Sequence, residues 1–414
     1  MDTFAGTTAG ASVERAIAAG RDAFASTWSP NRVAVAPGRI ELLGNHVDYN
    51  GGPVLAAAID RFIVVAASDE SRGSQSLRAV AADIPDGSVV ALDADALGDW
   101  RNPSPPPNSF DYVRGLIASL VQRPSLDPQL PASIAIAGDV PMGFGVSSSA
   151  ALCVGLALAL AEGFSGQEDV VLVAQEAEHR AGTPCGTMDQ SASVAGGAIA
   201  FDGATLGVER LDPDLGDLVF ALADSGVERT LGSSSYPRRV AESREALALV
   251  QGELGPDVAN LAALAATQLD DLEARGILSG VLAQRARHVV DETARVHAGQ
   301  EAMIAGDWPR FGRLMTESGR SSATLYDISH PRVEELVAAA LGVEGVLGAR
   351  MMGGGEGGAA LVLLPRETVP DLERTLVSRY YRRHGMADRE GLIHVCAFAP
   401  GAAVVPLLGS SAIG

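Results

Sequence analysis

The stretch APGRIELLGNHVDYNGGPVLAAAID, residues 36–60, concentrates polar side chains in a short segment between apolar, strand-like runs. Each hydroxyl of a sugar both donates and accepts hydrogen bonds, so such a cluster on a loop between strands suits a polyhydroxylated ligand. An ordinary polar turn is the alternative; it accounts for residues 50–52 at the tip but leaves the rest of the cluster unexplained. The cluster consists of Arg39, Glu41, Asn45, His46, Asp48, Tyr49 and Asn50.

A second segment, PMGFGVSSSA at residues 141–150, follows a strand expected over 133–140 and precedes a helix rich in alanine and leucine. Its glycines, Gly143 and Gly145, permit close approach of backbone amides, and the helix N-terminus adds partial positive charge, so triphosphate oxygens fit here. Three serines add hydroxyls for phosphate or Mg²⁺: Ser147, Ser148 and Ser149. A helix capped by serine after a tight turn is the alternative. A dinucleotide site is less favoured, because serine stands where G-x-G-x-x-G requires its third glycine.

Two further segments complete the set of candidates. GGGEGG, residues 353–358, lies between strand-like runs and is either part of the same site or a hairpin turn. CGTMDQ, residues 185–190, places the carboxylate of Asp189 among small side chains, where it could act as a base. A helix cap or a solvated charge is the alternative for Asp189.

The length of 414 residues predicts two domains, and 47% hydrophobic residues supply ample core. Turn-rich FDGATLG, starting at Phe201, sets the expected boundary near residue 205, which gives domains 1–205 and 206–414. Strand-like and helical runs alternate without a regular repeat, which indicates a mixed α and β protein. We expect helices over 13–24 and within 261–314, and strands over 32–36, 54–58 and 62–68. Residues 346–365 are expected to form two strands joined by a glycine turn, and residues 391–405 a strand pair. Residues 102–110 are expected to form a proline-rich surface loop.

The formal net charge of −20 argues against nucleic acid and anionic membranes as partners and favours a small molecule. The chain contains no lysine, which excludes a Walker A loop; a phosphate site must use arginine, backbone amides, a helix N-terminus or a metal. Apolar runs such as 150–161 are too short to span a membrane, and the first residues lack a signal pattern, so we expect a cytoplasmic protein. The widely spaced Cys153, Cys185 and Cys396 indicate buried free thiols.

Taken together and in this order, these segments resemble the GHMP kinase superfamily and, within it, the galactokinases. GRIELLGNHVDYNGG at 38–52 is similar to the galactokinase signature GRVNLIGEHTDYNGG, and PMGFGVSSSA to the phosphate loop P-x-G-x-G-L-S-S-S-A. RMMGGGEGGAA at 350–360 is similar to the third motif of the superfamily, and CGTMDQ to CGIMDQ. Weaker similarity extends the resemblance over almost the whole chain: SSSYPRR at 233–239, RARHVVDETARV at 285–296, GDWPRFGRLMTES at 306–318 and LYDISHP at 325–331.

The resemblance implies a two-domain α+β fold, with an N-terminal domain like the second domain of ribosomal protein S5, a ferredoxin-like C-terminal domain, and an active site in the cleft between them. It implies a monomer that uses ATP and Mg²⁺ to phosphorylate the C1 hydroxyl of galactose. A kinase for N-acetylgalactosamine, arabinose or galacturonate is the near alternative, and a non-catalytic galactose sensor is a more distant one.

The resemblance also assigns roles by motif. Arg39 and Asp189 are expected to be catalytic, with Arg39 keeping Asp189 ionised. Asn45, His46, Asp48 and Tyr236 are expected to bind sugar; Gly143, Gly145, Ser147, Ser148 and Ser149 to bind the nucleotide phosphates; and Ser149 and Glu178 to bind the metal. The sequence departs from the family at Asn45, where a sugar-contacting glutamate is usual, and at Glu41, where asparagine is usual. Glu356 replaces an apolar or aromatic residue of the third motif.

Overall fold

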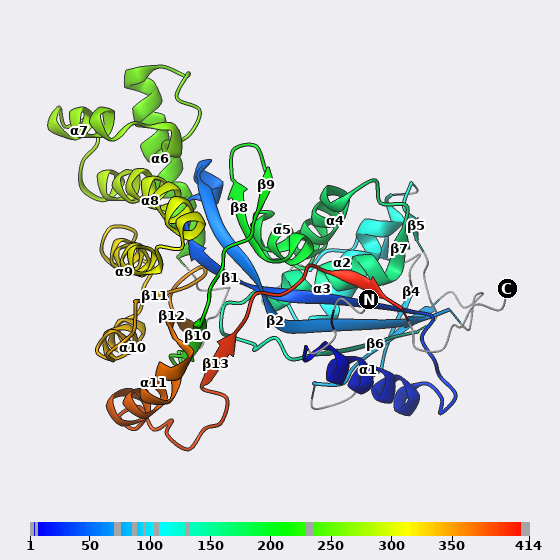
Figure 1. Cartoon of the computed structure of the whole chain (residues 1–414). Coiled ribbons are helices and arrows are strands. Elements are labelled where there is room, and N and C mark those ends of the chain that lie inside the picture. Colours follow the sequence, from blue (N-terminus) through cyan, green and yellow to red (C-terminus); the bar gives the residue numbers. More distant parts are fainter. Residues whose placement is uncertain are drawn as a thin grey trace.

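The computed structural model describes residue 4 and residues 7–69, 76–84, 89–93, 97–102, 107–123, 125–128, 133–227 and 235–406. Within these residues the chain forms an eight-stranded sheet, a four-stranded sheet and a two-stranded ribbon, with helices packed on the two larger sheets (Figure 1). The predicted mixture of helices and strands without a regular repeat is confirmed.

Two long strands, β1 (Arg32–Leu43) and β2 (Pro53–Ser68), pair in antiparallel fashion at the centre of the eight-stranded sheet. Both run further than the sequence predicted, because β1 continues past 36 and the two strands expected over 54–58 and 62–68 are one strand. The sheet order is β14-β1-β2-β6-β3-β4, and β8 pairs with both β2 and β9. The other strands of this sheet are β3 (Ser76–Ala81), β4 (Val90–Asp93), β6 (Ser133–Gly138), β8 (Ala198–Asp202), β9 (Val208–Leu211) and β14 (Ala403–Val405).

The charged pair Asp60 and Arg61 does not interrupt β2, because a later segment of the chain satisfies both side chains. The Asp60 carboxylate accepts a hydrogen bond from the Ala397 amide at 3.0 Å, and Arg61 Nη2 donates to the Val395 carbonyl at 3.1 Å. A strand can therefore carry charges in its middle where neighbouring backbone supplies their partners.

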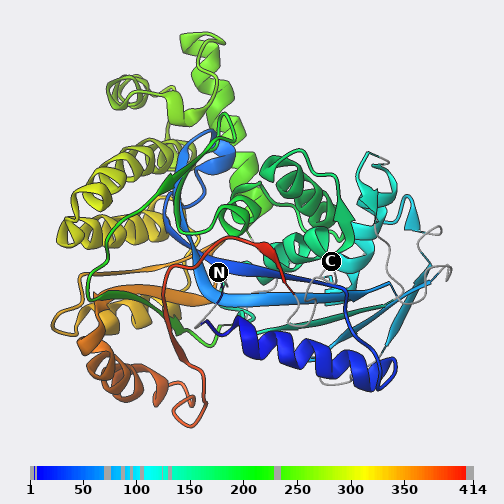
Figure 2. The ribbon, with the colours of Figure 1, turned by 45° about the vertical axis from the view of Figure 1, so that its right-hand side comes forward.

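Alternate residues of β1 face opposite layers. Val33 and Val35 pack with α1 (Ala9–Ala23), and Ala34 and Ala36 pack with the helices of the other face. Figures 1 and 2 show α1 alone on one side of the sheet. The helix predicted over 13–24 begins earlier, at Ala9. Its buried residues, Ala9, Ser12, Ala16 and Gly20, are small and recur at helical spacing, so the added first turn also packs closely on the sheet. The helices of the other face are α2 (Ser109–Val121), α3 (Ser148–Leu160), α4 (Gln167–Arg180) and α5 (Met188–Ala195).

The four-stranded sheet is antiparallel throughout, in the order β11-β12-β10-β13. Its strands are β10 (Leu218–Asp224), β11 (Gly348–Met351), β12 (Ala359–Pro365) and β13 (Ile393–Cys396). The helices of this half of the chain are α6 (Tyr236–Leu254), α7 (Ala266–Ala274), α8 (Gly280–Ala305), α9 (Trp308–Thr324), α10 (Pro331–Leu341) and α11 (Val369–Leu376). Shorter elements are η1 (Asp48–Asn50), η4 (Leu261–Ala263), η5 (Arg366–Thr368), the π-helical η6 (Val377–Tyr381), and the ribbon strands β5 (Asp127–Pro128) and β7 (Ala161–Glu162).

The helical prediction for 261–314 is confirmed by η4, α7, α8 and the start of α9, and the strand, glycine turn and strand over 346–365 by β11 and β12. The strand pair predicted over 391–405 is wrong in its pairing: β13 joins β10, whereas β14 joins β1 in the other sheet. The two strands separate because the residues between them bridge elsewhere, Phe398 to Ile59 of β2 and Pro400 to Gly196 just before β8.

Three further predictions concern the proline-rich loop, the cysteines and membrane-spanning helices. Residues 103–106 of the predicted proline-rich loop lie outside the described residues, and its last two residues already belong to α2, which Asn108 caps. All three cysteines are free; Cys153 and Cys396 are buried as predicted, whereas Cys185 is partly exposed because it lines a cavity. No helix of the described part of the chain is long and apolar enough to cross a bilayer.

The domain boundary near residue 205 stays a prediction. The chain is still part of the eight-stranded sheet in β9 and enters the four-stranded sheet at β10. β14 then returns the last described strand to the first sheet.

We predict that two helical glycines respond in opposite ways to alanine. A Cβ on Gly115 of α2 would lie 2.4 Å from the carbonyl oxygen of Ala177 in α4, whereas Gly252 of α6 has no atom within 4 Å of that position. Gly115→Ala should lower the free energy of unfolding by about 2 kcal/mol through overpacking. Gly252→Ala should raise it by about 0.5–1 kcal/mol through helix propensity. Urea denaturation measures both, and equal effects would contradict the packing of α2 on α4.

Candidate active site

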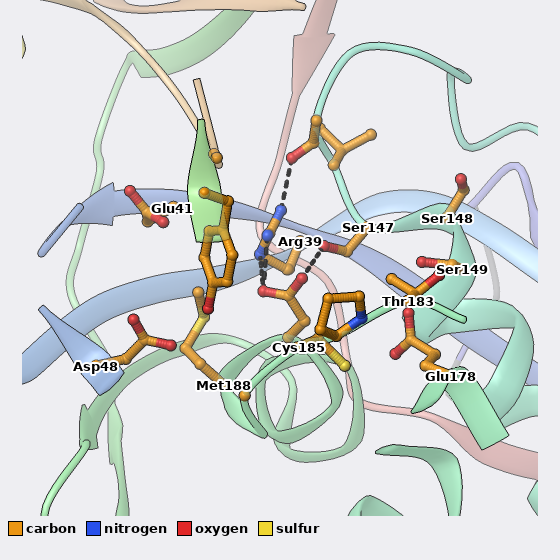
Figure 3. A pocket seen from close by; sticks show the side chains of 18 of the residues that line it. Arg39, Glu41, Asp48, Ser147, Ser148, Ser149, Glu178, Thr183, Cys185 and Met188 are labelled. Atoms are coloured by element: carbon orange, nitrogen blue, oxygen red, sulfur yellow. Dashed lines mark hydrogen bonds and ion pairs between the residues drawn. The ribbon is translucent and has the colours of Figure 1, made fainter. Parts of the chain in front are cut away.

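A cavity of about 570 Å³ lies where the four sequence segments converge (Figure 3). Residues of β1 and of the polar loop after it form part of its wall, as do the glycine loop before α3 and the segment leading into α5. Gly353 and Gly354 and the start of α6 complete it. The cavity is thus lined from both sheets of the molecule. Of the predicted site residues, the lining includes Arg39, His46, Asp48, Gly143, Gly145, Ser147, Ser148, Ser149, Glu178, Asp189 and Tyr236.

An ion pair between Arg39 and Asp189 lies in this cavity. Arg39 Nε and Nη2 approach Asp189 Oδ1 at 2.7 and 2.6 Å, and Arg39 Nη1 donates to the carbonyl oxygen of Gly145 at 2.6 Å. The Ser147 hydroxyl donates to the second carboxylate oxygen, Oδ2. The Arg39 side chain is only 6% exposed and that of Asp189 27% exposed, so a fixed, largely desolvated cation is bonded both to a carboxylate and to the glycine loop.

The glycine loop is held in an unusual backbone conformation. Gly143 and Gly145 have φ values of 82° and 75°, and Ser147 has φ 56° in the left-handed region, where a non-glycine residue is strained. The Arg39 amide donates to the Val146 carbonyl at 3.1 Å, and a Cβ on Gly38 would lie 2.9 Å from that oxygen. Glycine at 38 is thus required for β1 to approach the loop this closely.

The structure does not support the alternative in which serine only caps the helix. Ser147 is the residue before α3, but its side chain makes no capping hydrogen bond and is directed to Asp189 instead. The amides of the first turn of α3, at Ser148 and Ser149, have no partner within the helix because of their position. Free amides at a helix N-terminus favour an anion.

Glu178 of α4 lies beside Ser149 and is buried. Burial raises the pKa of the Glu178 carboxyl to about 7, although hydrogen bonds from Ser149 and Gln190 lower it in part. Hydroxyl and carboxylate oxygens are hard donors that suit Mg²⁺, and a cation here would relieve the cost of burying the carboxylate charge. Within the described residues no group of three or more His, Cys, Asp or Glu could hold a metal, so any cation at this position would need further oxygen ligands.

The polar loop contributes His46 and Asp48 to the lining. His46 Nδ1 is hydrogen-bonded to the Tyr49 hydroxyl at 2.9 Å, and the His46 ring lies 5.4 Å from that of Tyr236. Burial, reinforced by the negative charges of Glu41 and Asp189, raises the pKa of Asp48 to about 7. The rings of His46 and Tyr49 thus contact that of Tyr236, the first residue of α6.

The structure does not bring Asn45 to the cavity, and it places Glu41 there instead. Asn45 is fully buried behind the wall, whereas Glu41, at 5% exposure, forms part of it. The sugar contact was expected at position 45 because the family signature carries a sugar-contacting glutamate there, and nothing local in the sequence shows that position 41 faces the cavity instead. Other lining residues not singled out from the sequence are Pro141, Val146, Gly182, Thr183, Pro184, Gly186, Met188 and Pro237.

Two residues of α8 hold the backbone of the polar loop. His288 Nε2 lies 2.9 Å from the Asn45 carbonyl oxygen, and its Nδ1 lies 2.8 Å from the Ser321 hydroxyl. Burial lowers the pKa of His288 to about 4, so the neutral ring donates through Nε2 and accepts at Nδ1. One helical turn later, Glu292 accepts from the amides of Gly44 at 3.0 Å and Asn45 at 3.4 Å.

Comparisons with known proteins agree with this geometry. The family descriptions that match are "Galactokinase galactose-binding signature" over residues 21–69, "GHMP kinases N terminal domain" over 111–197 and "GHMP kinases C terminal" over 300–383. The galactokinase of Thermotoga maritima is 34% identical over 361 residues, which cover 85% of this chain and 94% of the relative. The human galactokinase is 35% identical over 379 residues, covering 89% and 93%.

Solved structures give the same result. Lactococcus lactis galactokinase complexed with galactose superposes with a TM-score of 0.81 at 26% identity, covering 94% of this chain and 99% of that one. A mevalonate kinase superposes with a TM-score of 0.60 at 15% identity, over 89% of this chain and 99% of that one, which is a likeness of fold alone.

We predict that Glu292→Gln destabilises the protein and reduces its sensitivity to acid. Burial would raise the pKa of Glu292, but Arg295, His288, Arg350 and the Ser318 hydroxyl outweigh it and lower the pKa to about 2. A lowered folded-state pKa contributes stability above about pH 4.5 that is lost as the pH falls towards 2. The variant should therefore lose about 3 kcal/mol at pH 7 and less at pH 3, measured by urea denaturation.

Glu301→Gln is the matched control on the same helix, because the Glu301 side chain is 71% exposed and forms its ion pair, with Arg310, at the surface. It should change the free energy of unfolding by less than about 0.5 kcal/mol at either pH. Equal effects of the two substitutions would show that Glu292 does not support the loop.

Proposed function

The chain belongs to the galactokinase family of the GHMP kinases, and from that premise we propose which of its residues carry the ATP-dependent phosphorylation of the C1 hydroxyl of galactose. The reaction yields galactose 1-phosphate and ADP. The observation that carries the assignment is the Arg39–Asp189 ion pair, which is bonded to the glycine loop through Gly145 and borders the polar loop in one cavity.

In the proposed mechanism Asp189 accepts the proton of the C1 hydroxyl. The hydroxyl oxygen then forms a bond to the γ-phosphorus of ATP while the bond from that phosphorus to the bridging oxygen breaks, and ADP leaves. Arg39 stabilises the negative charge that spreads over the transferred group, and it also holds Asp189 in its orientation. Ser147, which donates to Asp189 Oδ2, fixes the second carboxylate oxygen.

We propose that the glycine loop binds the phosphates of ATP. Gly143 and Gly145 allow the backbone to approach the phosphates, Ser147 shapes the end of the loop, and Ser148 and Ser149 add hydroxyls and the free amides of the α3 N-terminus. The whole chain lacks lysine, and Arg39 is the cation of the cavity lining among the described residues. Backbone amides and one arginine therefore supply the positive charge towards the phosphates that a lysine supplies in P-loop proteins.

The metal proposal concerns Ser149 and Glu178. Their oxygens fit Mg²⁺, which bound between them would neutralise phosphate charge. The raised pKa of Glu178 supports this assignment, because a buried carboxylate without a cation is costly in its charged form. This chain's part would be to hold the cation at the N-terminus of α3, on the phosphate side of the cavity.

Sugar binding is proposed for His46, Asp48 and Tyr236, which line the cavity together. Asp48 is one of four carboxylates in the lining, with Glu41, Glu178 and Asp189, and Arg39, the lining cation, is already engaged by Asp189. An anionic sugar would lie among these carboxylates with no unengaged arginine in the described lining, which disfavours galacturonate among the alternatives. The cytoplasmic location, the monomeric state and the absence of nucleic acid or membrane partners stay predictions of the sequence.

A panel of sugars tests the function directly. With Mg²⁺-ATP we expect ADP release on galactose well above the rate without sugar, and galacturonate at background because of the carboxylate-lined cavity. N-acetylgalactosamine and arabinose complete the panel. Turnover of one of these but not of galactose would overturn the galactokinase assignment, and binding of galactose and ATP without product would indicate a sensor.

Replacing the proposed base should slow the chemical step and spare sugar binding. Asp189→Asn keeps the shape of the side chain but removes its basicity, so kcat should fall by about 10²–10⁴-fold. The dissociation constant of galactose, measured by calorimetry, should change by less than about 10-fold. Asp270→Asn, at an exposed position on α7, is the control and should leave both unchanged. Undiminished kcat in Asp189→Asn would remove Asp189 from the mechanism.

A further inference from the structure

The side chain of Asn45 is buried, is hydrogen-bonded within the protein and does not line the cavity. Its Nδ2 donates to Glu41 Oε1 at 2.7 Å and to the Gly353 carbonyl oxygen at 2.8 Å, and its Oδ1 accepts from the Ser322 hydroxyl at 3.0 Å. Because Nδ2 faces two acceptors, the orientation of the amide is fixed by its surroundings. Asn45 is fully buried, so its hydrogen bonds connect the polar loop to the third glycine cluster and to α9.

Glu41 is placed differently. Its Oε1 accepts both from Asn45 and from Arg350 Nη2 at 3.2 Å, and among the described residues no hydrogen bond reaches Oε2. The side chain forms part of the cavity wall. One carboxylate oxygen is therefore held by the protein, and the other is left for whatever occupies the cavity.

Arg350 explains why the carboxylate at position 41 is tolerated. It is fully buried on β11 and donates to the carbonyl oxygens of Leu42 at 3.1 Å and Met351 at 2.9 Å as well as to Glu41. A buried guanidinium requires an anionic partner, and Glu41 supplies it. A carboxylate at position 45 would instead face the Gly353 carbonyl and Glu41, both acceptors, where only a donor such as the Asn45 amide fits.

The position of Glu41 in the cavity indicates which part of a ligand it meets. In Figure 3, Glu41 and Asp48 lie on one side of Arg39, and Ser149 and Glu178 lie on the other. The proposed phosphate site is on the side of Ser149, so the sugar ring extends towards Glu41 and Asp48. A group near Glu41 is consequently a ring substituent other than the reacting C1 hydroxyl.

Resting on the proposed function, we propose that Glu41 is a specificity-determining residue of this kinase: its Oε2 accepts a hydrogen bond from one galactose hydroxyl other than that at C1. Asn45 and Arg350 are positioning residues that hold the Glu41 carboxylate at the cavity wall. Relative to the galactokinase signature, glutamate and asparagine have thus exchanged positions 41 and 45. In this proposal the sugar contact has moved with the carboxylate to position 41.

A comparison of deoxy sugars tests this proposal. Dissociation constants are measured by calorimetry for galactose and its 2-, 3-, 4- and 6-deoxy derivatives, with wild type and with Glu41→Gln, which preserves shape and removes the charge. The variant should bind galactose about 10- to 100-fold more weakly, because a hydrogen bond to a charged group is lost. For one deoxy sugar, which lacks the partner hydroxyl, the two proteins should differ by less than about twofold, since there is no such bond to lose.

A uniform loss over all five sugars, or no loss at all, would overturn the proposal, because a residue that only shapes the wall has no preferred hydroxyl. Glu41→Asp, which withdraws the carboxylate by one methylene, provides a second variant and should single out the same deoxy sugar. Ser322→Ala is the matched control: it removes a partner of Asn45 without reaching the cavity wall and should affect all sugars equally. A hydroxyl-specific loss in Ser322→Ala alone would assign the contact to Asn45. Wild type that neither binds nor phosphorylates galactose would refute the proposed function itself, before Glu41 is considered.

Discussion

The contact between β1 and the glycine loop is the constraint on which the active site depends. At Gly38 the strand lies so close to the Val146 carbonyl that a side chain would collide with it. The pairing of β1 with β2 shifts register between Pro37 and Arg39, which turns the Arg39 side chain towards the loop and Asp189. β1 and the glycine loop, for which we propose roles towards different substrates, are thereby fixed to one another by backbone, and the ion pair of Arg39 with Asp189 beside them needs no rearrangement to be in place.

Features that are local in the sequence could be predicted from it. The glycine loop, the polar loop and the Asp189 segment are identifiable because glycines or polar side chains cluster within a few positions of the sequence. The structure brings all three to one cavity, and the glycines of the glycine loop have positive φ. The long course of β2 could not be predicted, because the partners of Asp60 and Arg61 come from near the other end of the chain.

Non-local contacts also explain what was missed in the site. His288 holds the Asn45 carbonyl across 243 positions, and from the sequence alone it is one polar residue in a helical run. The choice between Glu41 and Asn45 as the cavity residue is decided by Arg350 and by the Gly353 carbonyl, neither of which lies near them in sequence. The third glycine cluster thus acts partly through the support it gives to the polar loop.

The pairing of β14 with β1 has a consequence for biosynthesis. Val33, Ala34 and Val35 of β1 are synthesised long before their partners at 403–405. Until those partners emerge, β1 is an open sheet edge able to pair with another nascent chain. The eight-stranded sheet therefore cannot be completed until all strands of the four-stranded sheet, which precede β14 in the sequence, have also been synthesised.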